Sequence, residues 1–323
     1  MKKIMLGIVA VLCMVLFVSA AFAGEKGAIS NSEGTYWAPW FKPALYVGYA
    51  FDAIDTHYTF NTRGAPLLGA IKFDMEPPRL SGIYTALELP VNVTCRLKLA
   101  LGGSLTSNLT SDDMREVYNA VVARRSWDLD NSDNRWSADF LASYAFVKDL
   151  SFIKDISAVA GVRWDYHTSR FDEPFNVIGI ASSATDKIDF IMYTVAPVFG
   201  LTSTFKGYQY GIFGGDIKLG LLGGPIVFGH VDYKERFGGA ARIHFDDDLN
   251  SGGYLFKVFG EITALSGKIT PAIDGSLSIF AQCTFSKAGG TLDGTAHTGV
   301  TQGFDFETDS SVVAIGLKAA ITF

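Results

Sequence analysis

The last thirteen residues of the chain, 311–323, constrain its fold more than any other stretch. Counting back in twos from the terminal Phe323 gives an unbroken apolar set, Ile321, Ala319, Leu317, Ile315 and Val313. The residues between them are smaller or more polar, so the period of two indicates a β-strand with two different faces. A soluble sandwich rarely leaves such an apolar edge at a chain end, because the edge invites pairing with another molecule. In a closed transmembrane barrel the edge pairs with the first strand and the apolar face meets lipid.

The N-terminus has the three parts of a secretory signal. Lys2 and Lys3 are basic, 4–18 is apolar, and a small-x-small pattern ends at Ala23. We therefore predict a signal peptide over 1–23 and a mature domain over 24–323. Removing two lysines and no acid moves the formal charge from −6 to about −8. This acidic balance argues against a nucleic-acid partner.

The remaining apolar residues are dispersed. After the signal peptide no apolar run approaches the roughly 20 residues that a spanning helix needs. Mean hydropathy is nevertheless +0.22, because apolar residues recur one in two, as over 93–101, 138–146, 156–166, 256–262 and 277–285. We predict an all-β fold, a transmembrane antiparallel up-and-down β-barrel of about ten strands. An ordinary soluble sandwich is the alternative.

Long and short connections alternate between the predicted strands. The short ones fall near 90, 149, 206 and 267, and the long ones near 61–70, 107–135, 169–187, 223–253 and 287–309. Outer-membrane barrels have this alternation, with the long connections at the cell surface. The predicted location is therefore the outer membrane of a diderm bacterium, with five loops exposed to the outside.

The strand face opposite the apolar one carries six acidic and six basic residues. A Lys or Arg facing lipid at the midplane costs about 2–4 kcal/mol, so these charges are expected to point inward. They are Asp52, Glu88, Arg96, Lys98, Asp139, Arg163, Asp165, Asp216, Lys218, Lys257, Glu261 and Lys318. Equal numbers in a narrow lumen predict paired charges that fill it, which disfavours a general diffusion pore.

Three stretches carry a resemblance to a known family. Pro197-Val198-Phe199-Gly200-Leu201-Thr202, followed by Gly214-Gly215-Asp216-Ile217-Lys218, is similar to the sixth and seventh strands of the omptins and the turn that joins them. The ending, Gly316-Leu317-Lys318 through Thr322-Phe323, is also similar. Omptins are outer-membrane endopeptidases built as ten-stranded barrels, and the resemblance covers most of the mature chain as architecture.

The resemblance implies a catalytic site. Omptins activate a water between an Asp-His pair and an acidic pair across a groove. Carried over, the first pair falls on His230 as general base and Asp232 as the residue that orients it, in an order reversed from the family pattern. The reversal moves the imidazole by roughly 6–7 Å, which endangers positioning. Asp128 and Asp130 match the opposing pair, with Asp112-Asp113 as competitor.

Plainer interpretations stay open for each of these residues. Asp128 and Asp130 also suit a turn-rich loop, and His230 suits a surface loop. The run Asp246-Asp247-Asp248 is either a patch for a divalent cation or bridged lipopolysaccharide, or a solvated acidic run. On another strand, His167 beside Asp165 forms a second inward His–Asp arrangement.

Three functions are therefore weighed. The first is an omptin-like aspartyl-type endopeptidase with an acidic groove for cationic peptides, without a cofactor and with lipopolysaccharide as activator. The second is a non-enzymatic surface barrel for adhesion or envelope stability, and the third a small-solute channel. The expected partners are outer-membrane lipid and lipopolysaccharide, together with the insertion machinery, whose recognition signal the Phe323 strand resembles. We expect a monomer.

Overall fold

The computed structural model describes most of the mature chain. The described residues are 41–62, 70–75, 79–118, 121–177, 180–207, 209–210, 213–237, 241–250, 252–295 and 301–323. The predicted signal peptide, 1–23, lies outside them. Among the described residues, no helix is long and apolar enough to cross a membrane.

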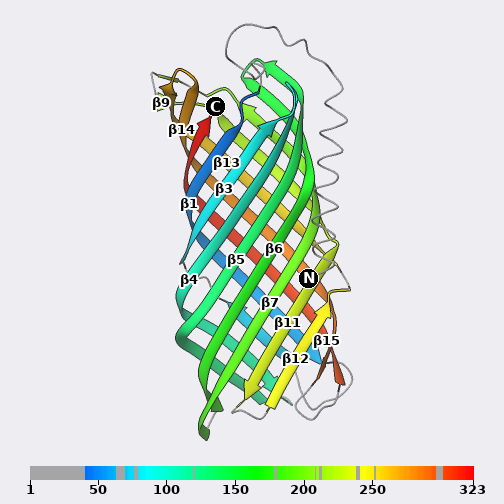
Figure 1. Ribbon diagram of the computed structural model, residues 1–323. Helices are drawn as coiled ribbons and strands as arrows, with labels where there is room; N and C mark the ends of the chain where they lie inside the picture. Colours follow the sequence, from blue (N-terminus) through cyan, green and yellow to red (C-terminus); the bar gives the residue numbers. More distant parts are fainter. Residues whose placement is uncertain are drawn as a thin grey trace.

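The described strands form one antiparallel sheet that closes on itself (Figure 1). They are β1 (Ala44–Thr62), β2 (Ala70–Met75), β3 (Arg79–Pro90), β4 (Cys95–Tyr118), β5 (Val121–Leu150), β6 (Ile153–Val177), β7 (Ile180–Phe205), β8 (Gln209–Tyr210), β9 (Phe213–Gly214), β10 (Ile217–Ile226), β11 (Phe228–Phe237), β12 (Ala241–Asp248), β13 (Gly253–Thr270), β14 (Ile273–Thr295) and β15 (Thr301–Thr322). β2 and β3 together occupy one strand position of the barrel, between β1 and β4. β10 and β11 together occupy a second such position, and β12 and β13 a third. The ring therefore has about ten strand positions.

The C-terminal strand closes the ring, as the sequence predicts. β15 pairs with β1 from Ala44 opposite Thr322 to Thr62 opposite Phe304. Its other edge pairs with β14 from Asp274 opposite Thr322 to Thr295 opposite Thr301. Both edges are therefore hydrogen-bonded along nearly the whole strand, which removes the open edge that an isolated terminal strand would expose.

Most of the predicted long loops are in fact strand. β4 and β5 continue through 107–135 and leave only 119–120 between their ends, and β6 and β7 leave only 178–179. The prediction was wrong here because it followed the apolar alternation, which ends where the strands leave the membrane. Interstrand hydrogen bonds do not depend on side-chain polarity, so the ladder continues outward.

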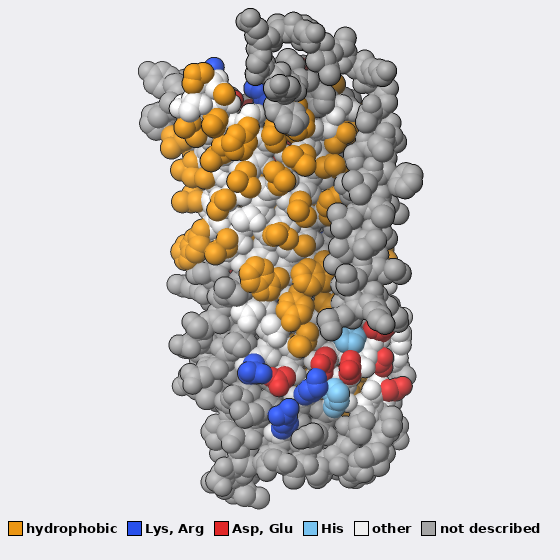
Figure 2. Space-filling model, viewed as in Figure 1, with side chains coloured by type: hydrophobic (Ala, Val, Ile, Leu, Met, Phe, Trp, Pro, Cys, Tyr) orange, Lys and Arg blue, Asp and Glu red, His pale blue; other side chains and the backbone are white. Residues whose placement is uncertain are grey.

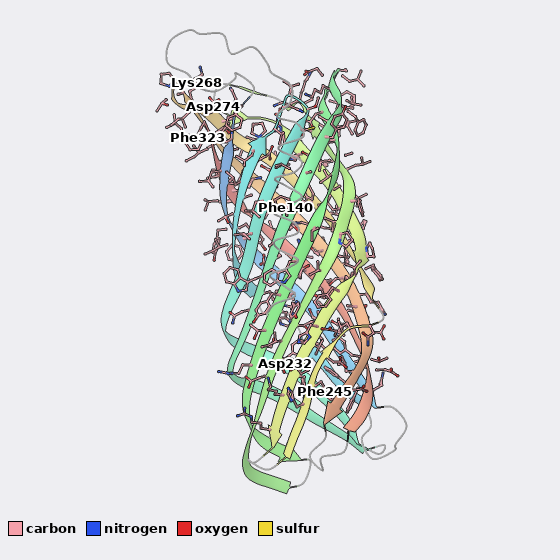
Figure 3. All side chains as sticks on the ribbon, turned by 45° about the vertical axis from the view of Figure 1, so that its right-hand side comes forward. Phe140, Asp232, Phe245, Lys268, Asp274 and Phe323 are labelled. Atoms are coloured by element: carbon pink, nitrogen blue, oxygen red, sulfur yellow. The ribbon has the colours of Figure 1, made fainter. Side chains whose placement is uncertain are left out.

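The short turns lie together at the opposite end. The turn after Pro90 is confirmed, with the Asn92 side chain accepting hydrogen bonds from the backbone of Thr94 and Cys95. The predicted turn at Ser266-Gly267 is wrong, because β13 continues to Thr270 and the turn falls at 271–272. Figure 3 shows Phe323, Lys268 and Asp274 at this end and Phe245 and Asp232 near the other.

An apolar belt surrounds the barrel next to the short-turn end. Large hydrophobic side chains project outward there, and Phe51 is 64 % exposed and Leu317 55 % exposed. Figure 2 shows this apolar surface and, beyond it, a group of charged and histidine side chains. So large an apolar surface is unfavourable in water, and it matches the lipid-facing band of a transmembrane barrel. The belt comprises Leu45, Val47, Phe51, Ile83, Leu87, Leu99, Leu101, Phe199, Leu201, Leu219, Leu221, Val258, Ile262, Ile279, Ile315 and Leu317.

Candidate functional site in the barrel lumen

Inside the belt, the lumen holds a network of buried charges. The Arg163 guanidinium donates to Asp139 at 3.0 Å and to Asp165 at 2.7 Å, and the Lys257 ammonium donates to Asp139 at 2.9 Å. Asp139 and Arg163 are almost fully buried. Ion pairs bridge the strands here because a charge with no partner in this setting is costly. The predicted inward, paired arrangement is confirmed for these four residues.

Further pairs continue the network toward the short-turn end. Arg96 donates to Glu88 at 2.8 Å, and Lys318 donates to Glu261. Asp52 differs from these carboxylates, because it accepts hydrogen bonds from the Tyr84 hydroxyl at 2.8 Å rather than from a cation. The pairing is therefore uneven along the lumen, although acids and bases are equal in number.

A cavity of about 110 Å³ lies within this network, and we call it the lysine cavity. Among the described residues, four lysines from four different strands and two carboxylates line it. The charged lining residues are Lys98, Lys218, Lys257, Lys318, Asp139 and Glu261.

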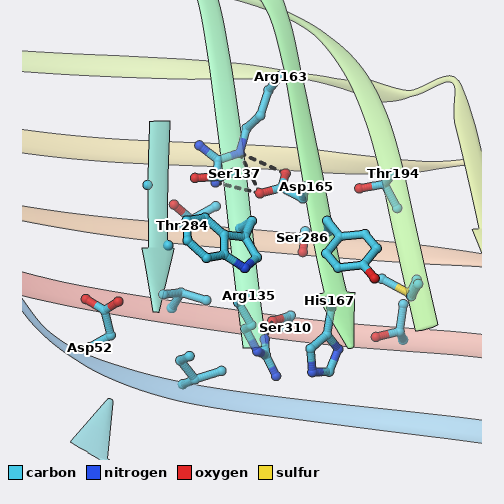
Figure 4. Close-up of a pocket in the computed structure, with 18 of the residues that line it drawn as sticks. Asp52, Arg135, Ser137, Arg163, Asp165, His167, Thr194, Thr284, Ser286 and Ser310 are labelled. Carbon is cyan, nitrogen blue, oxygen red and sulfur yellow. Dashed lines mark hydrogen bonds and ion pairs between the residues drawn. The ribbon is translucent and has the colours of Figure 1, made fainter. Parts of the chain in front are cut away.

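A second cavity, of about 100 Å³, lies further from the short turns, and Figure 4 shows it. Arg163 and Asp165 border it on one side and His167 and Arg135 on the other. Arg135 donates to Thr56 at 2.9 Å. This cavity has both charge signs in its wall.

His167 does not pair with Asp165, although the sequence suggested that arrangement. Its Nδ1 is hydrogen-bonded to the Tyr58 hydroxyl and its Nε2 lies 2.8 Å from the Ser169 oxygen, while Asp165 pairs with Arg163. Ser169 is 1 % exposed. Through the Tyr58 contact, this group joins β6 to β1.

Beyond His167, a group of buried aromatic side chains lies in the lumen, and we call it the aromatic cluster. Its members come from β1, β7, β11, β12 and β15, and Phe245 and Phe304 meet edge to face at 4.3 Å between ring centroids. Phe60 lies 4.9 Å from Phe306, and Tyr58 lies 4.7 Å from Phe190. Each such pair adds about 0.5–1.5 kcal/mol beyond area burial. The cluster comprises Tyr58, Phe60, Phe190, Tyr233, Phe245, Phe304 and Phe306. Sequence reasoning missed it, although large aromatics at every second position were the available signal.

His230 and Asp232 lie on the outer face of β11. Val231 and Tyr233, which alternate with them, are fully buried in the lumen. His230 contacts two carboxylates of β12, with its Nε2 3.2 Å from Asp246 and its Nδ1 3.1 Å from Asp248.

Asp232 has partners of its own. Its carboxylate accepts a hydrogen bond from Lys234 at 2.6 Å and lies 3.4 Å from His244. The expected orientation of His230 by Asp232 is therefore not what the structure shows. The adjacent strand, β12, supplies the carboxylates instead, because His230 lies opposite Asp248 in the β11–β12 register.

The geometry around His230 limits its chemistry. A general base needs a ring nitrogen that faces the water it deprotonates. Both nitrogens of His230 instead face carboxylate oxygens at 3.1–3.2 Å. A neutral imidazole has one N–H donor and can donate to one of these acids, and only a protonated imidazole could donate to both. The acidic run Asp246-Asp247-Asp248 is thus partly engaged by a histidine.

The structure describes only the backbone at Asp128 and Asp130, on β5. The pairing β11–β7–β6–β5 aligns His230 with Trp136 through Tyr193 and Tyr166. Asp130 lies six residues beyond Trp136, roughly 20 Å along the strand at about 3.3 Å per residue. The backbones of the two predicted pairs are therefore not close to each other. The competing Asp112 pairs with Trp127 on the same distant part of the barrel.

Comparisons with known proteins give one informative match. No family model and no curated protein matches the chain. Among solved structures, the outer membrane protease OmpT from Escherichia coli aligns with a TM-score of 0.61 at 11 % identity, over 91 % of this chain and 100 % of that one. The chain has the fold of an omptin-like outer-membrane barrel. At this identity the likeness extends to the fold alone.

Other barrels align less well with this omptin-like barrel. The toluene transporter TodX from P. putida has a TM-score of 0.32 at 9 % identity, covering 88 % of this chain and 91 % of its own. The translocator domain of the autotransporter NalP from Neisseria meningitidis has 0.28 at 11 % identity, covering 96 % of each chain. Neither likeness is strong enough to add to the fold assignment.

Proposed function

We propose that this omptin-like barrel is a non-enzymatic surface protein that carries a rigid extension of its strands outside the membrane. The aromatic cluster is the observation that carries the proposal. It occupies the lumen beyond the belt, where a peptide hydrolase of this fold would need an open, polar groove. A filled lumen stiffens the extension, and its polar outer face and hairpin ends are then the surfaces available for adhesion or for envelope stability.

The peptide-hydrolase hypothesis is the second candidate. Its support is the likeness to the protease OmpT and the presence of His230 among carboxylates. Against it stand the outward direction of His230, the engagement of both its ring nitrogens and the distance to Asp128 and Asp130. Cationic peptides would be its substrates and lipopolysaccharide its activator.

The channel hypothesis meets the same obstacle. A solute crossing the lumen would have to pass the aromatic cluster, whose members are at most 4 % exposed. Close-packed aromatic side chains leave no continuous water path. We therefore expect no stable unit conductance in planar bilayers. A reproducible unit conductance would contradict the closed-barrel proposal.

Among partners, we propose that outer-membrane lipid and lipopolysaccharide surround the apolar belt. The terminal strand is proposed to carry the signal for the insertion machinery. Deleting Phe323 should then reduce assembly in cells more than it reduces refolding into detergent. Equal losses in both assays would remove the insertion role.

The deciding experiment is peptide cleavage by the refolded barrel with lipopolysaccharide present. The panel contains peptides with paired basic residues, and His230→Ala and Asp130→Asn are assayed beside the parent protein. We expect no cleavage by any of the three. Cleavage by the parent that His230→Ala abolishes would establish the hydrolase and reject the non-enzymatic proposal.

A further inference from the structure

The lysine cavity has more positive than negative groups in its wall. Lys98 from β4, Lys218 from β10, Lys257 from β13 and Lys318 from β15 all line it. The two carboxylates, Asp139 and Glu261, are already bound to Lys257 and to Lys318. Four cations and two anions leave an excess of two positive charges among the described residues that line this cavity.

Lys98 and Lys218 carry that excess. Among the residues that the structure describes, neither forms an ion pair with a carboxylate. Lys98 lies 6.0 Å from the centre of the Tyr46 ring, and Lys318 also lies over this ring, at 4.6 Å. An aromatic face stabilises a cation less than a carboxylate would in this setting.

Among the described residues, no neighbouring acid forms an ion pair with Lys98 or Lys218. Asp52 is bonded to the Tyr84 hydroxyl at 2.8 Å. Glu88, on β3, is bound to Arg96 at 2.8 Å, so this pair adds one charge of each sign. Arg163 is bound to Asp139 and Asp165, so Arg163 and Asp165 also add one charge of each sign. Enclosed cations of like sign repel one another and call for a counter-ion.

The cavity also has the size and donors for such an ion. At about 110 Å³ it holds several waters, since one needs roughly 10–15 Å³ by this measure. Ser137 and Gln282 line it beside the lysines and supply hydroxyl and amide donors, whereas the Tyr84 hydroxyl already donates to Asp52. Several donors around one space suit an acceptor with several oxygens, and lysine is a common phosphate binder.

We propose that the lysine cavity binds a small inorganic oxyanion of the phosphate class, held by the ammonium groups of Lys98 and Lys218. The anion enters from the short-turn end, which faces the periplasm. Arg96, whose side chain is 62 % exposed, lies on that route two residues before Lys98. The site would neutralise the lumen and tie four strands of the barrel together.

Isothermal titration of the refolded barrel with inorganic phosphate, in chloride-free buffer, tests the proposal. We expect one phosphate per barrel. The double variant Lys98→Met and Lys218→Met should bind at least tenfold more weakly. The control is Lys268→Met, which removes one positive charge at the short-turn end outside the cavity and should bind like the parent.

Two further measurements keep the test decisive. Heat-dependent migration on gels shows whether each variant is folded, and phosphate should raise the denaturation midpoint of the parent but not of the double variant. Absence of binding by the folded parent would overturn the proposal, as would equal binding by the folded double variant. Chloride competing with phosphate at equal concentration would also overturn it, because the site would then not select an oxyanion.

Discussion

Replacing Asp139 with alanine should lower the free energy of unfolding by about 3–5 kcal/mol, the usual cost of breaking a buried ion pair. Its carboxylate accepts a hydrogen bond from Arg163 at 3.0 Å and one from Lys257 at 2.9 Å. Each hydrogen bond to a charged group is worth about 1.5–3 kcal/mol. Arg163 keeps Asp165 as a partner, so the larger share of the loss comes from Lys257.

The assay is urea unfolding of the barrel refolded in lipid vesicles, followed by tryptophan fluorescence in buffer without phosphate. The control is Asp274→Ala, because the Lys42–Asp274 pair is 3.9 Å long and half exposed. Such surface pairs contribute about 0–1 kcal/mol.

A double variant distinguishes the free energy lost with the ion pair from the cost of leaving the Lys257 ammonium without its partner. Adding Lys257→Met to Asp139→Ala should recover part of the stability, because an unpaired buried ammonium disappears. A loss below about 1 kcal/mol in the single variant would refute the reasoning, since a buried pair costs several times that when broken. Two losses that simply add in the double variant would refute it as well.

Three other predictions address the aromatic cluster, the extension and the belt. Gly294→Ala should destabilise the parent, because an added Cβ would lie 2.1 Å from the Phe245 ring. The same change should be tolerated in Phe245→Ala, a variant whose own free energy of unfolding is expected to fall by about 3–5 kcal/mol. A double-mutant cycle measures both effects. Hydrogen bonding to Glu307 raises the pKa of Lys287. The contribution of this pair to stability is therefore complete below the ordinary lysine pKa and is lost as pH rises through the raised value. NMR titration of Lys287 in the parent and in Glu307→Gln checks the shift. Leu317→Arg should cost about 2–4 kcal/mol in vesicles because this side chain faces lipid, and an unchanged urea midpoint would contradict the belt.

Local patterning in the sequence was enough to predict the membrane part. Alternation of apolar and polar residues decides which side chains face lipid, since the period of a strand is two. The alternation of apolar and polar residues around Lys98 and Arg163 predicted that both side chains face the lumen. It failed at Ser266-Gly267, where turn-forming residues lie inside a continuous strand, because pairing with β14 outweighs local turn preference.

The candidate site could be predicted only in part. The inward direction of the charged side chains follows from the cost of placing them in lipid, so this direction could be predicted from the sequence. Outside the membrane no such penalty applies, so nothing local to His230 indicated which face it would occupy. The presence of Val231 and Tyr233 on the inner face was the signal that was overlooked.

The sequence by itself determined that this chain forms a closed barrel with an apolar exterior and a charged interior. These properties depend on the identity of each residue and on its position in a two-residue period, both of which are local. Only the tertiary structure decided which charges meet, because partners such as Asp139 and Lys257 lie more than a hundred positions apart. Barrel closure and register choose those partners, and among the described residues they leave Lys98 and Lys218 beside one cavity without an ion-pair partner.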